Sequence, residues 1–447
     1  MNNNFILSLL TLFLIFLLSV IDESTATLAA GIFVIFTGCF LCLSVDKSHK
    51  NGAFKTLFLV APVYFVIAYI FSLSFDQGSN YVVSDSMRYL QYYQNSTEYF
   101  RGIDYLIDTY LKFSDNNGLY NSFIQYWAAV GNLHFGGATV FYMTLSQSLF
   151  GIFSSIILYR IIARRYPEKA VKYAVTFSCL SLFLFYSSVI IRDITMCVFF
   201  LYALDYLTQP FRLRRFVLLI IFAFVVWGIR LYSGLFFLVF PATYIILWLT
   251  RNMGKRETIF VMVIFGLLLM PVLVTSAIGE QAQAEVENYD TFSAERNVNG
   301  LFTKMSNLPL GIKQVTLTLF SQISPFPPEG FIKSAETFSQ YVMGIDVWIY
   351  ELYWFFIVFT FAYLTFFKSK YKLLSKNEII LGVIALSYIV INTAHPDIRR
   401  MMPVYPIIYL LYLVYDNNIA ASEIQSTRKR LFFLYVALFI FAVIYRG

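Results

Sequence analysis

The sequence predicts an all-α fold, a polytopic membrane bundle of about 13 spanning helices. Of its 447 residues, 59% are hydrophobic and 13% are charged, whereas soluble domains carry about 25% charged residues. Apolar runs of about 20 residues, long enough to cross a bilayer, recur along nearly the whole chain. These observations exclude a soluble enzyme and predict one membrane domain over residues 1–447.

Each candidate span is an apolar run that ends at charged residues or at Gly and Pro. The runs are 5–21, 26–45, 54–75, 138–159, 171–190, 193–208, 215–231, 233–250, 258–279, 346–367, 377–393, 401–415 and 431–445. No Lys or Arg precedes the first run and a second follows almost at once, so we interpret the first as an anchor helix rather than a signal peptide. The four cysteines lie inside apolar runs, which predicts neither a disulfide framework nor a metal site.

Lys and Arg are concentrated in every second connection between these spans. The basic connections are 46–53, 160–170, 209–214, 251–257, 368–376 and 416–430. Because cytoplasmic loops are enriched in Lys and Arg, the pattern predicts a cytoplasmic N-terminus and, with an odd number of spans, an outer C-terminus. The net charge of +7 then largely reflects the basic residues that keep these loops in the cytoplasm, and these residues can also attract anionic lipid head groups. No nucleic acid partner is expected.

Two connections are long, 76–137 and 280–345, and the orientation places both on the outer side. We expect them to carry interfacial helices, one beginning at Ser84, one over 102–113 and one over 311–324, because apolar residues recur there at helical spacing. Internal repeats and paired broken helices are not expected from the sequence.

Four arginines lie on short outer turns: Arg192, Arg230, Arg399 and Arg400. A guanidinium forks onto phosphate or carboxylate oxygens, so arginines here indicate an anionic ligand at the outer face. Singly, each can instead reach the membrane surface or pair with a carboxylate, as Arg192 can with Asp193. If they converge, they suit a pyrophosphate whose isoprenoid tail runs along the lipid face.

Two residues are candidates for acid and base chemistry. Asp85, near the start of an expected helix, can stay ionised and accept a proton, or simply cap the helix. His395, beside the Arg399 and Arg400 pair, can act as a base or serve a structural hydrogen bond. Asp205, near the inner end of a span, is either a proton relay or an interfacial residue. The sequence has no phosphate-binding Gly loop and no metal-ligand spacing, so neither metal nor cofactor is expected.

The chain resembles the Wzy and EpsG-like polysaccharide polymerases of bacterial envelopes over most of its length. The likeness rests on Ser84-Asp85-x-x-x-Tyr89-x-x-Tyr92, Ile191-Arg192-Asp193, Arg230 before Tyr232-Ser-Gly234, and His395-x-x-x-Arg399-Arg400 ahead of Pro403. The resemblance implies a glycosyltransferase of the GT-C type in the bacterial cytoplasmic (inner) membrane. This chain departs from the family in lacking an obvious basic cluster in 280–345.

In that family, oligosaccharide repeat units carried on undecaprenyl pyrophosphate are joined at the outer face to make O-antigen or exopolysaccharide. The resemblance therefore implies that Arg192, Arg230, Tyr232, Arg399 and Arg400 bind the donor. It gives the catalytic role to Asp85 or His395, and it leaves open a chain-length regulator as a partner. The alternatives are a ligase that moves a finished chain, or a flippase or transporter of the same lipid-linked sugar, which needs charges at the bilayer midplane.

The predicted orientation is tested by cysteine labelling in an otherwise cysteine-free chain. A membrane-impermeant maleimide should label Phe100→Cys and Asp290→Cys without permeabilisation of the inner membrane, because both positions lie in the long outer loops. Lys372→Cys, in a basic connection, should be labelled only afterwards. The opposite pattern would invert the orientation.

Overall fold

The structure is a computed structural model, and most of the residues it describes are helical. These residues are 3–75, 84–99, 117–254, 312–322, 335–392 and 398–446, with single residues and pairs between them. The chain forms two compact units. The first comprises Met1–Asp205, Phe224–Leu231 and Pro328–Tyr353, and the second comprises Tyr206–Ala223, Tyr232–Pro327 and Trp354–Gly447.

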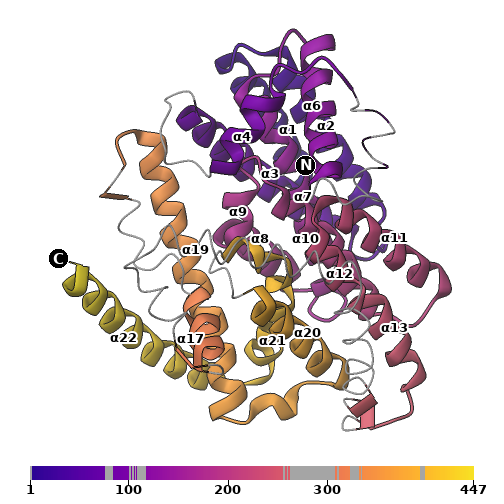
Figure 1. The fold of residues 1–447 in the computed structure, drawn as a ribbon, viewed down its shortest axis with the longest axis vertical. Coiled ribbons are helices and arrows are strands. Elements are labelled where there is room, and N and C mark those ends of the chain that lie inside the picture. Colours follow the sequence, from indigo (N-terminus) through magenta and orange to yellow (C-terminus); the bar gives the residue numbers. More distant parts are fainter. Residues whose placement is uncertain are drawn as a thin grey trace. The chain divides into compact units, whose positions relative to one another are not determined.

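The core of the first unit is α7 (Val140–Ala163), whose side chains are almost all buried. It packs against α2 (Thr25–Leu43), α3 (Lys50–Phe75) and α8 (Ala170–Leu180), and α1 (Asn3–Ile21) packs on α2 and α3 (Figure 1). The outward faces of α1 and α2 expose large apolar side chains. Such faces are expected where a helix meets lipid, since every backbone group is already paired inside the helix.

The two ends of these helices are grouped as the alternating distribution of Lys and Arg predicts. At one end the Thr139 hydroxyl donates to Asp22 (2.7 Å), and the Thr25 hydroxyl donates to the Phe135 carbonyl (2.7 Å). At the other end the Tyr159 hydroxyl donates to the His49 carbonyl (2.9 Å). Residues predicted to be outer therefore share one end of the unit and residues predicted to be cytoplasmic share the other. Which end faces outward stays a prediction.

The predicted span 171–190 is broken. After α8 come Ser181, the short helix α9 (Leu182–Tyr186) and the non-helical residues 187–191, all buried, before α10 (Arg192–Leu207) begins. Unpaired backbone is costly in an apolar interior, and serines from other helices satisfy it here. The Ser148 hydroxyl donates to the Ser187 carbonyl (3.0 Å), and the Ser86 hydroxyl donates to the Ile190 carbonyl (2.8 Å). The predicted span 171–190 is therefore not one continuous helix.

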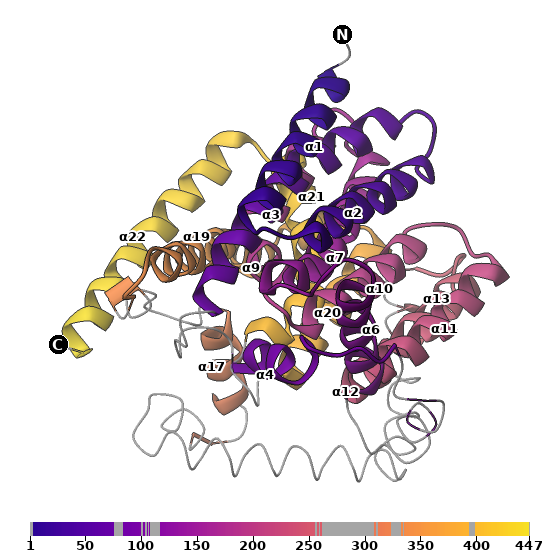
Figure 2. The same ribbon diagram turned by 90° about the horizontal axis from the view of Figure 1, so that it is seen from above.

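Two helices of the first unit come from the long connection 76–137. The helix expected from Ser84 is confirmed as α4 (Ser84–Tyr93), whereas α6 (Gly118–His134) was not expected. The two lie beside each other (Figure 2), and the Trp127 indole of α6 donates to the Tyr142 carbonyl of α7 (3.0 Å). The stretch expected over 102–113 lies almost wholly outside the described residues.

The remaining helices belong to the second unit, except that α11, α12 and α19 have residues in both. They are α11 (Leu213–Ile229), α12 (Leu231–Phe237), α13 (Val239–Leu249), α17 (Ile312–Ser321), α19 (Phe338–Ala362), α20 (Lys376–Asn392), α21 (Tyr405–Asn418) and α22 (Ala421–Arg446). Figure 2 shows α22 as one continuous helix that ends at the C-terminus. The helix expected over 311–324 is confirmed as α17.

A hydrogen-bonded contact anchors the end of α17 within the second unit. The Gln322 side chain donates to the Met401 sulfur (3.3 Å) and accepts from the Trp354 indole (3.2 Å). The Trp354 ring stacks on Tyr405 at 3.8 Å. The end of α17 therefore lies against the turns that precede α21.

Six helical stretches among the described residues are long and apolar enough to cross a membrane. They are Asn4–Ile21, Thr25–Leu43, Lys50–Phe75, Val140–Ala163, Leu231–Leu249 and Phe338–Phe367. The chain is therefore a polytopic helical membrane protein. The other seven predicted spans stay predictions: most correspond to shorter or interrupted helices, and most of 258–279 lies outside the described residues.

Candidate outer anion site

A buried ion pair joins the start of α10 to the junction between α11 and α12. Arg230 Nη1 donates to Asp193 Oδ1 at 2.9 Å, and the two side chains are 7% and 3% exposed. Arg230 is the residue between the two helices, and its amide still donates to the Val226 carbonyl (2.7 Å). A charge buried this deeply needs an opposite charge and hydrogen bonds, so the pair fixes where α10 starts.

Charged side chains that are less deeply buried lie next to this pair. Arg192, the first residue of α10, is half-buried. In α4, Asp85 lies 3.6 Å from Arg88, with side chains 31% and 50% exposed. The Ser86 hydroxyl that holds the Ile190 carbonyl fixes α4 over the start of α10.

Two tyrosines complete the arrangement. The rings of Tyr89 and Tyr120 meet edge to face at 5.0 Å, and both are buried. Burial raises the pKa of the Tyr89 phenol, an effect that the Arg192 charge opposes, and burial raises the pKa of Tyr120 well above its usual value. Both phenols are therefore neutral donors. The Tyr120 hydroxyl has no hydrogen-bond partner among the described residues.

We call these residues the outer cluster: Asp85, Arg88, Tyr89, Tyr120, Arg192, Asp193 and Arg230. Its three arginines against two aspartates leave one net positive charge. A positive site with a neutral, unused phenol donor in a partly dry setting is suited to bind an anion such as phosphate. A half-exposed carboxylate, Asp85, is placed to accept a proton beside it.

The outer cluster brings together three of the residues predicted from the sequence, namely Asp85, Arg192 and Arg230. Arg399 and Arg400 lie half-buried in a turn of the second unit (Ile398–Arg400). Tyr232 lies in α12, also in the second unit. The convergence of all four arginines on one ligand stays a prediction, and His395 lies outside the described residues.

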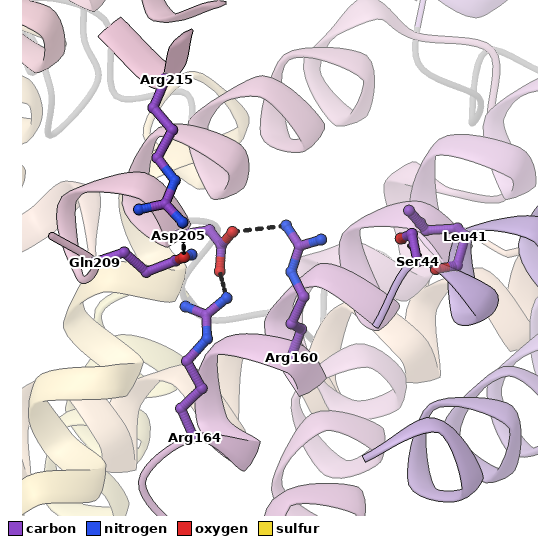
Figure 3. Close-up of polar contacts among 7 residues, drawn as sticks. All are labelled: Leu41, Ser44, Arg160, Arg164, Asp205, Gln209 and Arg215. Atoms are coloured by element: carbon purple, nitrogen blue, oxygen red, sulfur yellow. Dashed lines mark hydrogen bonds and ion pairs between the residues drawn. The ribbon is translucent and has the colours of Figure 1, made fainter. Parts of the chain in front are cut away.

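Asp205, at the opposite end of α10, contacts two arginines, and we call this arrangement the Asp205 clamp (Figure 3). Arg160 Nη2 donates to Oδ2 at 2.7 Å, Arg164 Nη2 lies 2.6 Å from Oδ1, and the carboxylate is 2% exposed. Both arginines lie at the end of α7, so the contacts tie the end of α10 to the end of α7. This geometry favours a structural role over the proton relay considered from the sequence.

Sequence reasoning missed three buried polar side chains of the first unit. Nothing in the sequence distinguishes Tyr120 from the many other aromatic residues of the chain. Asp346 and Glu351 lie in α19 and are 5% and 0% exposed. The Asp346 Oδ2 atom accepts no hydrogen bond from any described residue. Acidic residues at the start of the apolar run 346–367 were the available signal, since acids inside membrane helices are rare and usually functional.

The described part of the chain contains no group of three or more His, Cys, Asp or Glu residues that could hold a metal ion. Comparisons with known proteins find no matching family model, no similar curated protein and no similar solved structure.

The buried pair is tested by a double-mutant cycle on unfolding in detergent micelles. Asp193→Ala and Arg230→Ala should each lower the free energy of unfolding by about 3–5 kcal/mol, because each leaves a buried charge uncompensated. The double variant should lose clearly less than the sum of the two. The exposed pair serves as control, with Asp85→Ala and Arg88→Ala each costing about 0–1 kcal/mol. Additive losses at Asp193 and Arg230 would contradict the pairing.

Proposed function

We propose that the chain is a membrane glycosyltransferase, a polymerase that joins oligosaccharide repeat units carried on undecaprenyl pyrophosphate at the outer face of the bacterial cytoplasmic membrane. The observation that carries the proposal is the outer cluster. It combines a net positive charge, a neutral phenol donor and a carboxylate at the end of the helices predicted to face outward. The family resemblance supplies the substrate.

The length of α10 supports a lipid-linked substrate. Thirteen peptide units separate Arg192 from Asp205, which is about 20 Å of helix, whereas the hydrocarbon core is about 30 Å thick. With the Asp205 clamp at the inner surface, Arg192 lies several ångströms below the outer surface. A pyrophosphate attached to an isoprenoid tail reaches that depth while its tail stays in the bilayer.

In the proposed reaction, Arg192 binds the pyrophosphate and the Tyr120 hydroxyl donates to one of its oxygens. The acceptor sugar hydroxyl forms a bond to the anomeric carbon as the bond from that carbon to the phosphate oxygen breaks. Asp85 takes the hydroxyl proton, with His395 as the other candidate base. The lipid pyrophosphate leaves with the electron pair, and the positive site stabilises its charge. Arg399, Arg400 and Tyr232 remain candidates for holding the same donor.

A transporter of the same lipid-linked sugar is the second candidate, favoured by the break after α8. Eleven residues of α8 rise about 16 Å. If α8 begins at the membrane surface, Ser181 lies near the middle of the hydrocarbon core, which is about 30 Å thick. Discontinuous helices at the midplane are typical of carriers. The outer cluster itself lies at one face, which favours the transferase. A ligase would use the same donor site with a different acceptor.

The three functions separate in an Arg192→Ala strain when surface polysaccharide is resolved on gels. The polymerase proposal predicts single-repeat bands without a ladder, because translocated units stay unjoined. Arg192→Lys should recover little, since an ammonium lacks the fork, whereas Arg214→Ala, an exposed arginine of α11, should leave a normal ladder. Repeat units trapped inside would indicate a transporter, and a full ladder on the lipid carrier would indicate a ligase. A normal surface ladder in the Arg192→Ala strain would overturn the site.

Tyr120→Phe isolates the contribution of the buried phenol. Losing one hydrogen bond to a charged ligand costs about 1.5 kcal/mol, so polymer formation by the purified protein should fall about tenfold. Folding should be unaffected, because no described partner of the hydroxyl is lost. The matched control is Tyr126→Phe, a half-exposed tyrosine of the same helix. Equal rates in the two variants would remove Tyr120 from the site.

A further inference from the structure

A cavity of about 550 Å³ lies within the second unit, and none of its lining residues belongs to the outer cluster. Its lining comes from residues 207–211, from the end of α13 and from the start of α20. These segments belong to, or adjoin, three connections whose Lys and Arg content predicts a cytoplasmic position. Their meeting around one cavity places it at the membrane surface.

Two cations line the cavity, and none of its described lining residues is acidic. Arg251 is exposed, and its side chain makes no hydrogen bond or ion pair with another described residue. Lys376 is held in place, because its ammonium donates to the Thr250 carbonyl and to the Met253 carbonyl (3.2 Å) just beyond α13. One cation is thus fixed and the other is available to a ligand.

The walls of the cavity are aromatic and already ordered. Phe211 lies 4.9 Å from Tyr244 and 5.1 Å from Trp248, centroid to centroid. The Tyr244 hydroxyl donates to the Pro210 carbonyl (2.8 Å) and accepts from the Arg212 amide (2.9 Å), which ties the connection to α13.

Polar and apolar groups flank these walls. Gln209 lines the cavity, and its side-chain oxygen accepts a hydrogen bond from Arg215 (Figure 3). Trp248 is 46% exposed and its neighbour Leu249 63%, which leaves an apolar approach beside the cations. The site therefore matches a molecule with an anionic head and an apolar body.

We propose that this cavity binds the phosphate group of an anionic phospholipid, with Arg251 as the principal contact. A guanidinium forks onto two phosphate oxygens, and tryptophan at a membrane interface packs against the glycerol and upper acyl region. Lys376 supplies the second positive charge. The inference is independent of the reaction at the outer cluster, since it uses no residue of that site.

The test is thermal unfolding of the full-length protein in a neutral maltoside detergent, titrated with dihexanoyl phosphatidylglycerol. A ligand that binds only the folded chain raises the unfolding temperature with concentration, which gives an apparent Kd. Arg251→Ala should weaken that Kd about tenfold, the effect of losing one charge-assisted hydrogen bond. Arg214→Ala is the matched control, because it removes an exposed arginine from the same predicted face but not from the cavity, and its Kd should equal that of the wild type.

Two further probes identify the source of the phosphate. Dihexanoyl phosphatidylcholine, with no net charge, should bind more weakly than phosphatidylglycerol, and inorganic phosphate should stabilise little because it lacks the apolar body. Equal affinity of Arg251→Ala and wild type for phosphatidylglycerol would overturn the proposal. Stabilisation by inorganic phosphate as strong as that by the lipid would also overturn it, in favour of a site for a soluble phosphate.

Discussion

The arrangement at the end of the first unit that is predicted to face outward depends on the ion pair between Asp193 and Arg230. In an apolar interior neither charge is tolerated alone, so the start of α10 must lie against the junction of α11 and α12. That position carries Arg192 to a half-buried site under α4. There Arg192 adds a positive charge beside the neutral Asp193–Arg230 pair and the Asp85–Arg88 pair.

The helices whose apolar runs match the membrane thickness were predicted well from the sequence. α1, α2, α3 and α7 follow the predicted runs closely, since length and composition alone dictate them. The break after α8 was not predictable in this way. After Lys172 the run 171–190 contains no charged residue, Gly or Pro that would mark a break. The hydroxyls that satisfy its unwound backbone come from Ser86 and Ser148, which are distant in sequence. Only tertiary structure pairs these groups.

The candidate site was also predicted only in part, because the sequence shows which residues are unusual but not which of them meet. Charged residues stand out in an apolar chain, so Asp85, Arg192 and Arg230 were found. The partner of Asp193 was sought next to it in sequence, whereas the structure shows a partner 37 residues away. Tyr120 was missed because 33 tyrosines share its signature, and its unused hydroxyl is visible only once the fold has buried it.

Direct ligand binding tests the central claim that the outer cluster holds a phosphate-bearing lipid head. Farnesyl pyrophosphate, a short soluble isoprenoid pyrophosphate, can be titrated into the purified full-length protein and its Kd measured by calorimetry. The account predicts saturable binding that weakens about tenfold or more in Arg192→Ala and is unchanged in Arg214→Ala. Equal affinity of the Arg192→Ala variant and the wild type would contradict it.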